Sequence, residues 1–172
     1  MRSSPLRNRI ALLDVEASGL MRGAFPVEVA WWSEKSEDDL IIDPTDSWDT
    51  SKWDADAEAM HGLTVGELKR KGRHPRIVAA RLNQAFEGLL VFCDSPAHDV
   101  GWLDMLHDAG GVKRDYKVES IGKLLGHLGI DPDRAYELFD EMRNRHPPRG
   151  RGREGVHYLK AVFEAALRES SR

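Results

Sequence analysis

One stretch near the N-terminus decides the fold class of this chain: Arg9-Ile10-Ala11-Leu12-Leu13-Asp14-Val15-Glu16. Its apolar run opens into an alternation of apolar and acidic residues, which predicts a buried central strand. Ala17-Ser18-Gly19 follow it and predict the end of that strand. Because residues two apart in a strand point to the same side, Asp14 and Glu16 present two carboxylates together, near a strand end where a cleft can open.

Three further stretches have the composition of strands. Pro26 to Trp32 alternates after a turn rich in Gly and Pro, and Leu40-Ile41-Ile42 ends at Asp43-Pro44. Three strands in succession predict an antiparallel meander. Leu89 to Cys93 is a later apolar run and predicts another buried strand, which helical segments separate from the first three.

Helical patterns fill most of the remaining chain. In one of them Thr64 and Glu67 have the spacing of a capping box. The expected helices cover residues 56–61, 64–68, 75–86, 97–109, 120–129, 132–143 and 155–168. No repeat or long linker divides the sequence, so we expect residues 1–172 to form a single domain. Strands first and then alternating helices and strands predict an α/β or α+β domain with a mixed sheet.

The composition excludes several classes of protein. With 41% hydrophobic and 31% charged residues, the chain is not intrinsically disordered. No apolar run approaches the roughly 20 residues of a bilayer crossing, and residues 1–9 lack the apolar stretch of a secretory signal, so we expect a cytoplasmic protein without a membrane segment. The single cysteine, Cys93, cannot form an internal disulfide or a thiolate cluster, and its apolar surroundings predict a buried side chain.

Charge is unevenly distributed along the chain, whose net charge is −4. Residues 37–58 hold nine Asp or Glu against one Lys, whereas residues 143–153 hold five arginines spaced by Gly and Pro. Both stretches can be solvated surface. Spaced arginines on a mobile loop also suit the capture of phosphate groups, and the sequence leaves both interpretations open for that segment.

The carboxylates of Asp14 and Glu16 are candidate metal ligands. Their backbone positions are about 7 Å apart in a strand, a spacing at which two side chains can share divalent ions. Hard oxygen donors favour Mg²⁺ or Mn²⁺, which bind a few carboxylates together with water and substrate phosphates. By itself an Asp-x-Glu pattern is common, and exposed carboxylates at a strand end are the alternative.

Four motifs in order resemble the DEDD superfamily of 3′-to-5′ exonucleases, in its DEDDh subgroup, a ribonuclease H-like family that includes oligoribonuclease, ribonuclease T and proofreading subunits. The resemblance spans residues 10–168. Its motifs are Asp14-Val15-Glu16-Ala17-Ser18-Gly19-Leu20, Met60-His61-Gly62-Leu63-Thr64, Ala97-His98-Asp99-Val100-Gly101-Trp102-Leu103, and His157 at the start of the last helix.

This resemblance implies a ribonuclease H-like α/β fold, with a mixed five-stranded sheet in which an antiparallel meander is followed by parallel strands. It implies two Mg²⁺ or Mn²⁺ ions, with Asp14 bridging both, Glu16 on the ion that activates water, and Asp99 supporting the other. His157 would take the proton of the attacking water. The implied substrates are the 3′ ends of RNA or single-stranded DNA, and the small relatives are often homodimers.

One position departs from the family pattern. The family has an aspartate five residues after the third-motif histidine, and here that position is Val162. Neighbours on the same helical face carry no carboxylate, and Glu164 lies some 200° around the helix from Val162. Glu154 precedes the helix and could fold back. Loss of this ligand should weaken the water-activating ion, so the chain either needs more metal or binds nucleic acid without cutting it.

The remaining candidates would contact substrate. Leu20 and Met60 correspond to apolar residues that pack against the terminal base in relatives, with packing in the core or at its rim as the alternative. His61 is interpreted mainly as a local hydrogen-bonding residue beside the substrate. Trp102 could stack on a base, although a place in the core is favoured. The arginines expected to bind phosphate are Arg149, Arg151 and Arg153.

Three functions therefore compete. The first is a metal-dependent 3′-to-5′ exonuclease on RNA or single-stranded DNA. The second, favoured by Val162, is a catalytically weak or inactive nucleic-acid-binding member of the same fold. The third, favoured by the negative net charge, is a protein-interaction module on that scaffold. No motif specifies contacts to a 2′-hydroxyl, so the sequence does not distinguish RNA from DNA.

Overall fold

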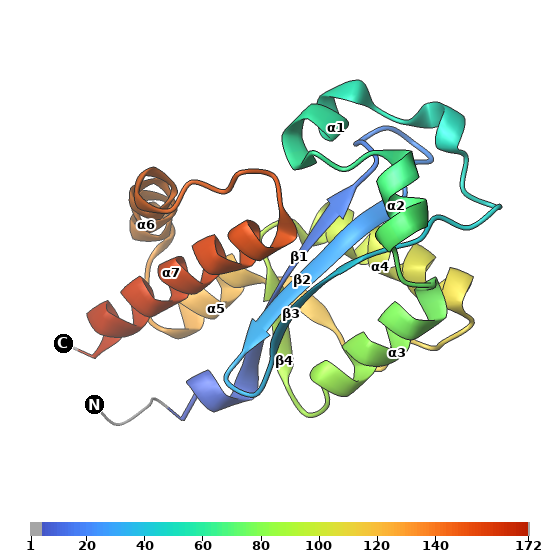
Figure 1. The fold of residues 1–172 in the computed structure, drawn as a ribbon. Helices are drawn as coiled ribbons and strands as arrows, with labels where there is room; N and C mark the ends of the chain where they lie inside the picture. Colours follow the sequence, from blue (N-terminus) through green and yellow to red (C-terminus); the bar gives the residue numbers. More distant parts are fainter. Residues whose placement is uncertain (1–4, 172) are drawn as a thin grey trace.

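The structure, a computed structural model, describes residues 5–171. Residues 1–4, which belong to the segment judged to lack a secretory signal, and residue 172 lie outside that range. A five-stranded sheet forms the centre, in the order β3-β2-β1-β4-β5 (Figure 1). The strands are β1 Ile10–Ala17, β2 Pro26–Ser33, β3 Glu37–Ile41, β4 Leu90–Cys93 and β5 Val118–Ser120.

The pairing of the strands confirms the expected mixed sheet. β1 pairs antiparallel with β2, and β2 pairs antiparallel with β3, which gives the meander. β1 pairs parallel with β4, and β4 pairs parallel with β5. The carboxyl ends of β1 and β4 therefore meet at one edge of the sheet, the edge at which open α/β sheets bind ligands.

Helices cover both faces of this sheet. The seven α-helices of the described residues are α1 Ala55–His61, α2 Val65–Lys71, α3 Pro75–Ala85, α4 Pro96–Gly110, α5 Ile121–His127, α6 Pro132–Arg145 and α7 Gly152–Ser170. Helix α7 packs across β1 and β2 and against α5 and α6, whereas α3 and α4 pack together on the other face (Figure 1). Thr64 and Glu67 form the expected capping box at the start of α2.

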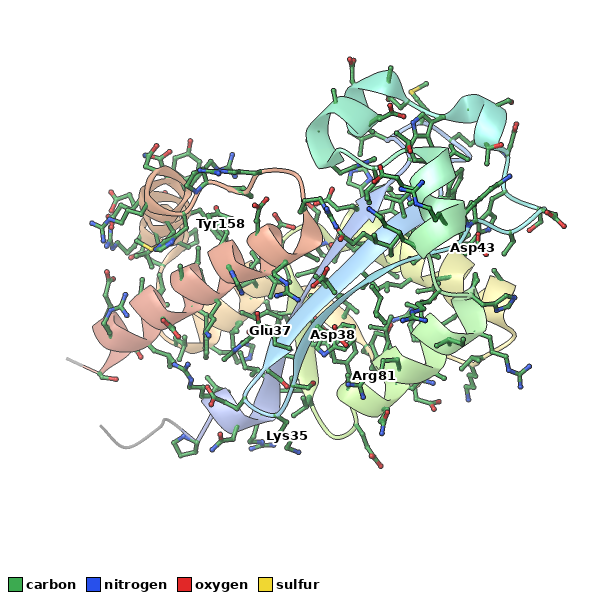
Figure 2. All side chains as sticks on the ribbon, viewed as in Figure 1. Lys35, Glu37, Asp38, Asp43, Arg81 and Tyr158 are labelled. Atoms are coloured by element: carbon green, nitrogen blue, oxygen red, sulfur yellow. The ribbon has the colours of Figure 1, made fainter. Side chains whose placement is uncertain are left out.

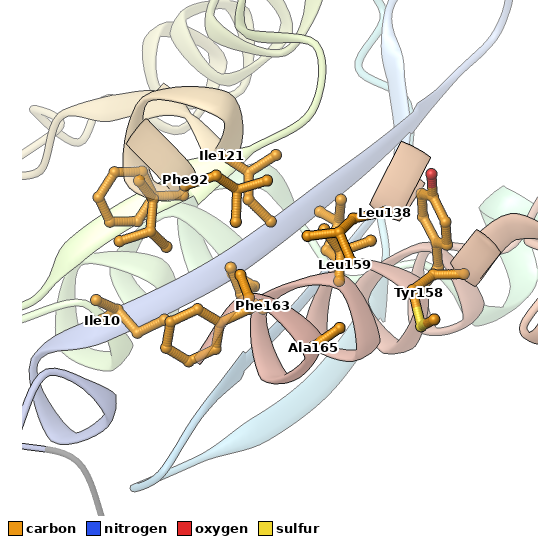
Figure 3. Close-up of a cluster of buried hydrophobic side chains, with 14 of the residues drawn as sticks. Ile10, Phe92, Ile121, Leu138, Tyr158, Leu159, Phe163 and Ala165 are labelled. Carbon is orange, nitrogen blue, oxygen red and sulfur yellow. The ribbon is translucent and has the colours of Figure 1, made fainter. Parts of the chain in front are cut away.

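Alternation along β1 separates two apolar cores. Ile10 and Leu12 point toward α5, α6 and α7, where they pack with side chains such as Leu159 and Phe163 (Figure 3). Ala11 and Leu13 belong to the core on the opposite face. Asp14 and Glu16 follow Ile10 and Leu12 at a spacing of two residues along β1. Their side chains therefore lie on the same face of the sheet, which α7 covers.

The structure differs from the sequence-based expectation at three places. β3 begins at Glu37 rather than at Leu40, as an edge strand whose acidic first residues have no apolar alternation. β5 has three residues and was marked by no pattern. Because α6 continues to Arg145 and α7 begins at Gly152, two of the five clustered arginines are helical at the end of α6 and a third lies in the first turn of α7.

Two expectations about single features also have outcomes. Cys93 is buried at the end of β4, as its apolar surroundings predict. Among residues 5–171, no helix combines the length and the apolar character needed to cross a bilayer.

Candidate active site

A pocket of about 360 Å³ opens at the carboxyl ends of β1 and β4. Three carboxylates line it, those of Asp14 and Glu16 from β1 and of Asp94, which directly follows β4. Met60 of α1 and a group of residues between Arg143 and Tyr158 line the rest. The pocket thus joins segments from the beginning, the middle and the end of the chain.

Asp99 lies behind these carboxylates, in the first turn of α4. It is only 3% exposed, and its Oδ2 atom is buried without a hydrogen-bond partner. Its charge is close enough to act on both Asp14 and Glu16. The structure therefore brings together the three carboxylates that the resemblance proposes as metal ligands, and their role in catalysis remains a prediction.

Burial and mutual repulsion disfavour negative charge at this site. Burial raises the pKa of Asp14 well above its usual range, and the charges of Glu16, Asp94 and Asp99 raise it further. Burial raises the pKa of Glu16 to about 7, with the neighbouring Glu28 carboxylate adding to the effect. Burial likewise raises the pKa of Asp99 to about 7, and the charge of Asp94 adds to it.

The donor chemistry of these residues fits a hard divalent cation. Carboxylate oxygens are the ligands that Mg²⁺ and Mn²⁺ prefer, and Oδ2 of Asp99, which has no hydrogen-bond partner, is available as a metal ligand. Within residues 5–171, however, no three His, Cys, Asp or Glu side chains already stand in a metal-binding arrangement. A cation would therefore be held by carboxylates that first turn toward it.

Glu28 on β2 lies directly opposite Glu16 in the antiparallel ladder, and it is fully buried. Its carboxylate accepts hydrogen bonds from Arg151 Nε, at 2.9 and 3.2 Å, and from Arg151 Nη2. The backbone N–H of Gly152 donates a further bond of 3.0 Å to Glu28 Oε2. This buried carboxylate is neutralised within the chain, and it fixes the start of α7 to the sheet.

The first turn of α7 meets Asp14 at Gly155. A Cβ atom at this position would lie 2.2 Å from Asp14 Oδ2, so only glycine allows the helix to approach so closely. The α7 residue that faces Asp14 therefore presents no side chain. Glu154, the residue before it, has a buried Oε2 atom without a hydrogen-bond partner but does not line the pocket.

The structure corrects the expected placement of the third motif. His157 was expected to face Asp14 and Glu16, but its side chain is half exposed and its Nε2 lies 2.7 Å from Oε1 of Glu37. Glu37 is the first residue of the edge strand β3 and is labelled in Figure 2. It does not line the pocket. Two residues beyond Gly155, it points about 200° away around the helix.

Val162 was expected to occupy the position of a missing metal ligand, and this expectation is also wrong. It is fully buried in the core beneath α7. Seven residues from Gly155, it faces the sheet again but lies about 10 Å further along the helix axis. There the partners are Ile10 and Leu12, the apolar part of β1, rather than its acidic end.

The three arginines expected to bind phosphate have different surroundings. Arg149 lines the pocket. Arg151 is held by Glu28, and Arg153 donates from Nε to Asp39 Oδ1 at 2.7 Å, on the edge strand. Only one of the three is therefore placed to meet a ligand in the pocket.

Of the other residues expected to contact substrate, some line the pocket and others do not. Met60 is 64% exposed and lines the pocket, whereas Leu20 is exposed without lining it. His61 is buried, and its Nδ1 accepts a 3.0 Å hydrogen bond from the N–H of Leu63, in agreement with a local hydrogen-bonding role. Trp102 packs against the core on the α3–α4 face, the alternative favoured for it.

Among the pocket residues with polar or charged side chains, three were not singled out from the sequence: Asp94, Arg143 and Tyr158. Asp94 directly follows an apolar strand, and this position at a strand end was a signal that could have identified it. Arg143 and Tyr158 lie on different helices, and only the packing of α6 against α7 brings them to the pocket.

The architecture as a whole is an α/β fold with a mixed five-stranded sheet between two layers of helices. Among solved structures it is similar to exonuclease I in a study of that enzyme's processivity, at 14% identity and a TM-score of 0.68, over 94% of this chain and 40% of that one. It is also similar to E. coli exonuclease I in complex with a dA16 oligonucleotide, at 12% identity and a TM-score of 0.70, with the same coverage of 94% and 40%.

A product-bound structure of exonuclease I is similar as well, at 13% identity and a TM-score of 0.60, over 94% of this chain and 46% of that one. This chain therefore spans less than half the length of those enzymes. At such low identity the likeness establishes the fold. No protein-family model and no curated protein matches the sequence.

Proposed function

We propose that this protein is a metal-dependent 3′-to-5′ exonuclease, a phosphodiester hydrolase that removes nucleotides from the ends of RNA or single-stranded DNA. One observation carries the proposal: the half-buried carboxylates of Asp14 and Glu16, whose pKa values are raised, gather with Asp94 in a pocket at the carboxyl ends of β1 and β4. The shared fold supports it, because the similar structures include exonuclease I bound to single-stranded oligonucleotides.

In this proposal Asp14, Glu16 and Asp99 hold one or two Mg²⁺ or Mn²⁺ ions. When bound, these ions would supply a nucleophilic water at neutral pH and stabilise the leaving oxygen. A zinc-bound form of an exonuclease I complex is among the similar structures, which supports metal dependence. The chain's own part is to exclude bulk water by packing α7 onto Asp14 and to present the exposed Met60 to the terminal nucleotide.

A second candidate is a member of the same fold that binds nucleic-acid ends without cutting them. Two observations favour it: the α7 residue facing Asp14 is glycine, and His157 is bonded to Glu37 outside the pocket. No histidine or fourth carboxylate from α7 therefore lines the pocket in the described part of the chain. Composition adds to both candidates the expectation of a cytoplasmic protein, and the resemblance adds the expectation of a homodimer.

Digestion of labelled strands distinguishes the two candidates. Single-stranded RNA and DNA are labelled at the 5′ or the 3′ end and incubated with the protein and Mg²⁺, Mn²⁺ or a chelator. An exonuclease of the proposed polarity releases a 3′ label at once as a mononucleotide, while a 5′ label passes through a ladder of shortened strands. Salt-sensitive binding without cleavage would support the second candidate instead.

Asp14→Asn is the matching variant, because it removes one charge and almost no volume. We expect it to abolish cleavage, while Asp46→Asn, at an exposed position remote from the pocket lining, leaves cleavage unchanged. Cleavage by Asp14→Asn at the wild-type rate would mean that the activity is a contaminant or that the site lies elsewhere.

A further inference from the structure

Four of the five arginines between residues 143 and 153 fall into two pairs. Arg151 and Arg153 are engaged by the carboxylates of Glu28 and Asp39. Arg143 and Arg149 line the pocket instead, and across the described range 5–171 neither forms an ion pair with a carboxylate. Two guanidinium groups without such partners thus stand in the same pocket as Asp14 and Glu16.

Arg143 is held in place by a fixed aromatic ring. Its guanidinium carbon lies 5.9 Å from the ring centroid of Tyr158. That ring cannot easily move, because Tyr158 is only 3% exposed and its hydroxyl donates a 3.1 Å hydrogen bond to the carbonyl of Phe139 on α6. Arg143 also hydrogen-bonds the side chain of Tyr158, and the N–H groups that do not face this residue are available to a ligand.

The backbone beside Arg149 is fixed at Gly150, the next residue in the chain. Gly150 has a φ of +78° and packs against α1 so closely that a Cβ atom there would lie 2.1 Å from the carbonyl oxygen of Met60. Glycine is required for both reasons. This contact fixes the backbone next to Arg149 at the pocket, on the side where Met60 is exposed.

We propose that Arg143 and Arg149 bind the phosphate group of the terminal nucleotide, so that the pocket takes a nucleoside 5′-phosphate as its ligand. The inference rests on the proposed function and names the residues that recognise its substrate. Guanidinium groups match the oxygens of a phosphate in charge and geometry. Both arginines line the same pocket as Gly155, the position at which α7 has no side chain.

The size of the pocket agrees with one nucleotide rather than several. Its volume of about 360 Å³ is near the lower end of the 300–1,000 Å³ range of small-molecule sites. The pocket also contains charges of both signs. An anion alone would be repelled by Asp14, Glu16 and Asp94. When a phosphate binds together with a divalent cation, the carboxylates can hold the cation and the arginines can hold the phosphate.

Calorimetric titration with adenosine 5′-monophosphate in saturating Mn²⁺ tests the proposal. We expect Arg149→Gln and Arg143→Gln each to weaken binding about tenfold or more, as for loss of a hydrogen bond to a charged group. Arg153→Gln, which removes an arginine paired outside the pocket, is the matched control and should bind as the wild type does. Adenosine without phosphate should bind equally to all four proteins.

Nucleotide affinity that is unchanged in both variants, or equally reduced in Arg153→Gln, would overturn the proposal, as would absence of binding by the wild type. Arg149 lies in an exposed loop, so its variant stays informative if Arg143→Gln fails to fold. Strand digestion is measured in parallel. Arginine-dependent nucleotide binding without digestion would leave this inference standing and reject hydrolysis, whereas digestion with unaltered binding in the variants would reject this inference alone.

Discussion

Glu16 and Glu28 are opposite each other on neighbouring strands, and both are carboxylates in the interior of the molecule. Glu28 has an arginine and a backbone N–H as partners supplied by the chain. Glu16 is half-buried and shares a hydrogen bond with the carboxyl of Asp14, while burial and the charges of Glu28 and Asp99 raise its pKa. The difference teaches that a buried carboxylate paired with an arginine holds the fold together, whereas a carboxylate whose hydrogen-bond partner is another carboxyl group marks a place where a bound cation would supply the missing charge.

The largest effect is expected where a carboxylate would have neither a partner nor a cation. Val162→Asp places a charge in the fully buried core beneath α7 and should lower the free energy of unfolding by about 4 kcal/mol or more. Urea denaturation measures the loss, and Val162→Ala, which only leaves a cavity, should cost roughly half as much. A stable Val162→Asp protein with tighter Mn²⁺ binding would mean that α7 is rotated or shifted from the position described above.

The second prediction tests the buried ion pair between Glu28 and Arg151. Arg151→Ala should destabilise the protein by about 2–4 kcal/mol, because it leaves Glu28 buried without its cation. Arg153→Ala removes a more exposed pair and should change stability by less than about 1 kcal/mol. Adding Glu28→Gln to Arg151→Ala should restore part of the loss. If the double variant is less stable than the single one, the arginine acts through packing rather than charge.

The third prediction concerns Glu16 and Asp99, whose raised pKa values should make the free energy of unfolding depend on pH. The pKa of about 7 at Glu16 and Asp99 exceeds the values in the unfolded chain, so the folded protein binds more protons between about pH 4 and 7. Protonation of these two groups contributes its whole stabilisation at pH values below their pKa in the unfolded chain. This contribution is lost as the pH rises through 7. Without metal, the free energy of unfolding should fall by about 2–3 kcal/mol between pH 5.5 and 8.

Saturating Mn²⁺ should raise the thermal midpoint more at pH 8 than at pH 5.5, because cation and proton compete for the same carboxylates. Glu16→Gln should flatten the pH dependence, whereas Glu119→Gln, in an exposed ion pair, should leave it unchanged. An unaltered slope in Glu16→Gln would assign the dependence to other groups.

The smallest expected effect has the opposite sign to most substitutions. Asp14→Asn removes one of the repelling charges and should stabilise the metal-free protein by about 1–2 kcal/mol while weakening Mn²⁺ binding. Thermal unfolding with and without Mn²⁺ measures both changes. Destabilisation of the metal-free protein would show that Asp14 has a structural role like that of Glu28.

The sequence predicted the elements whose residues carry a strong periodic pattern. β1 was predicted because alternate residues enter two different cores, and α2 because its capping box is a local signal. β5 was missed because three residues cannot show a period. The start of β3 was missed because edge residues such as Glu37 need no apolar alternation.

The candidate site was predictable where it depends on one strand and not where it depends on the position of a helix. Strand periodicity placed Asp14 and Glu16 together. Spacing from His157 to Val162 did not reveal how far α7 extends along the sheet, because that distance is fixed by the contact of Arg151 with Glu28. Such a contact between distant residues leaves no local pattern.

The bond between Glu28 and Arg151 joins residues 123 positions apart. Contacts of this span form late, since the entropy of a long closed loop opposes them until the intervening chain has folded. The acidic strand end is therefore made early in synthesis, but α7 covers it and Arg149 reaches it only after the last helix docks. A nascent or truncated chain would carry the carboxylates without the opposite wall of the pocket, so the order of assembly delays a complete pocket until α7 has docked.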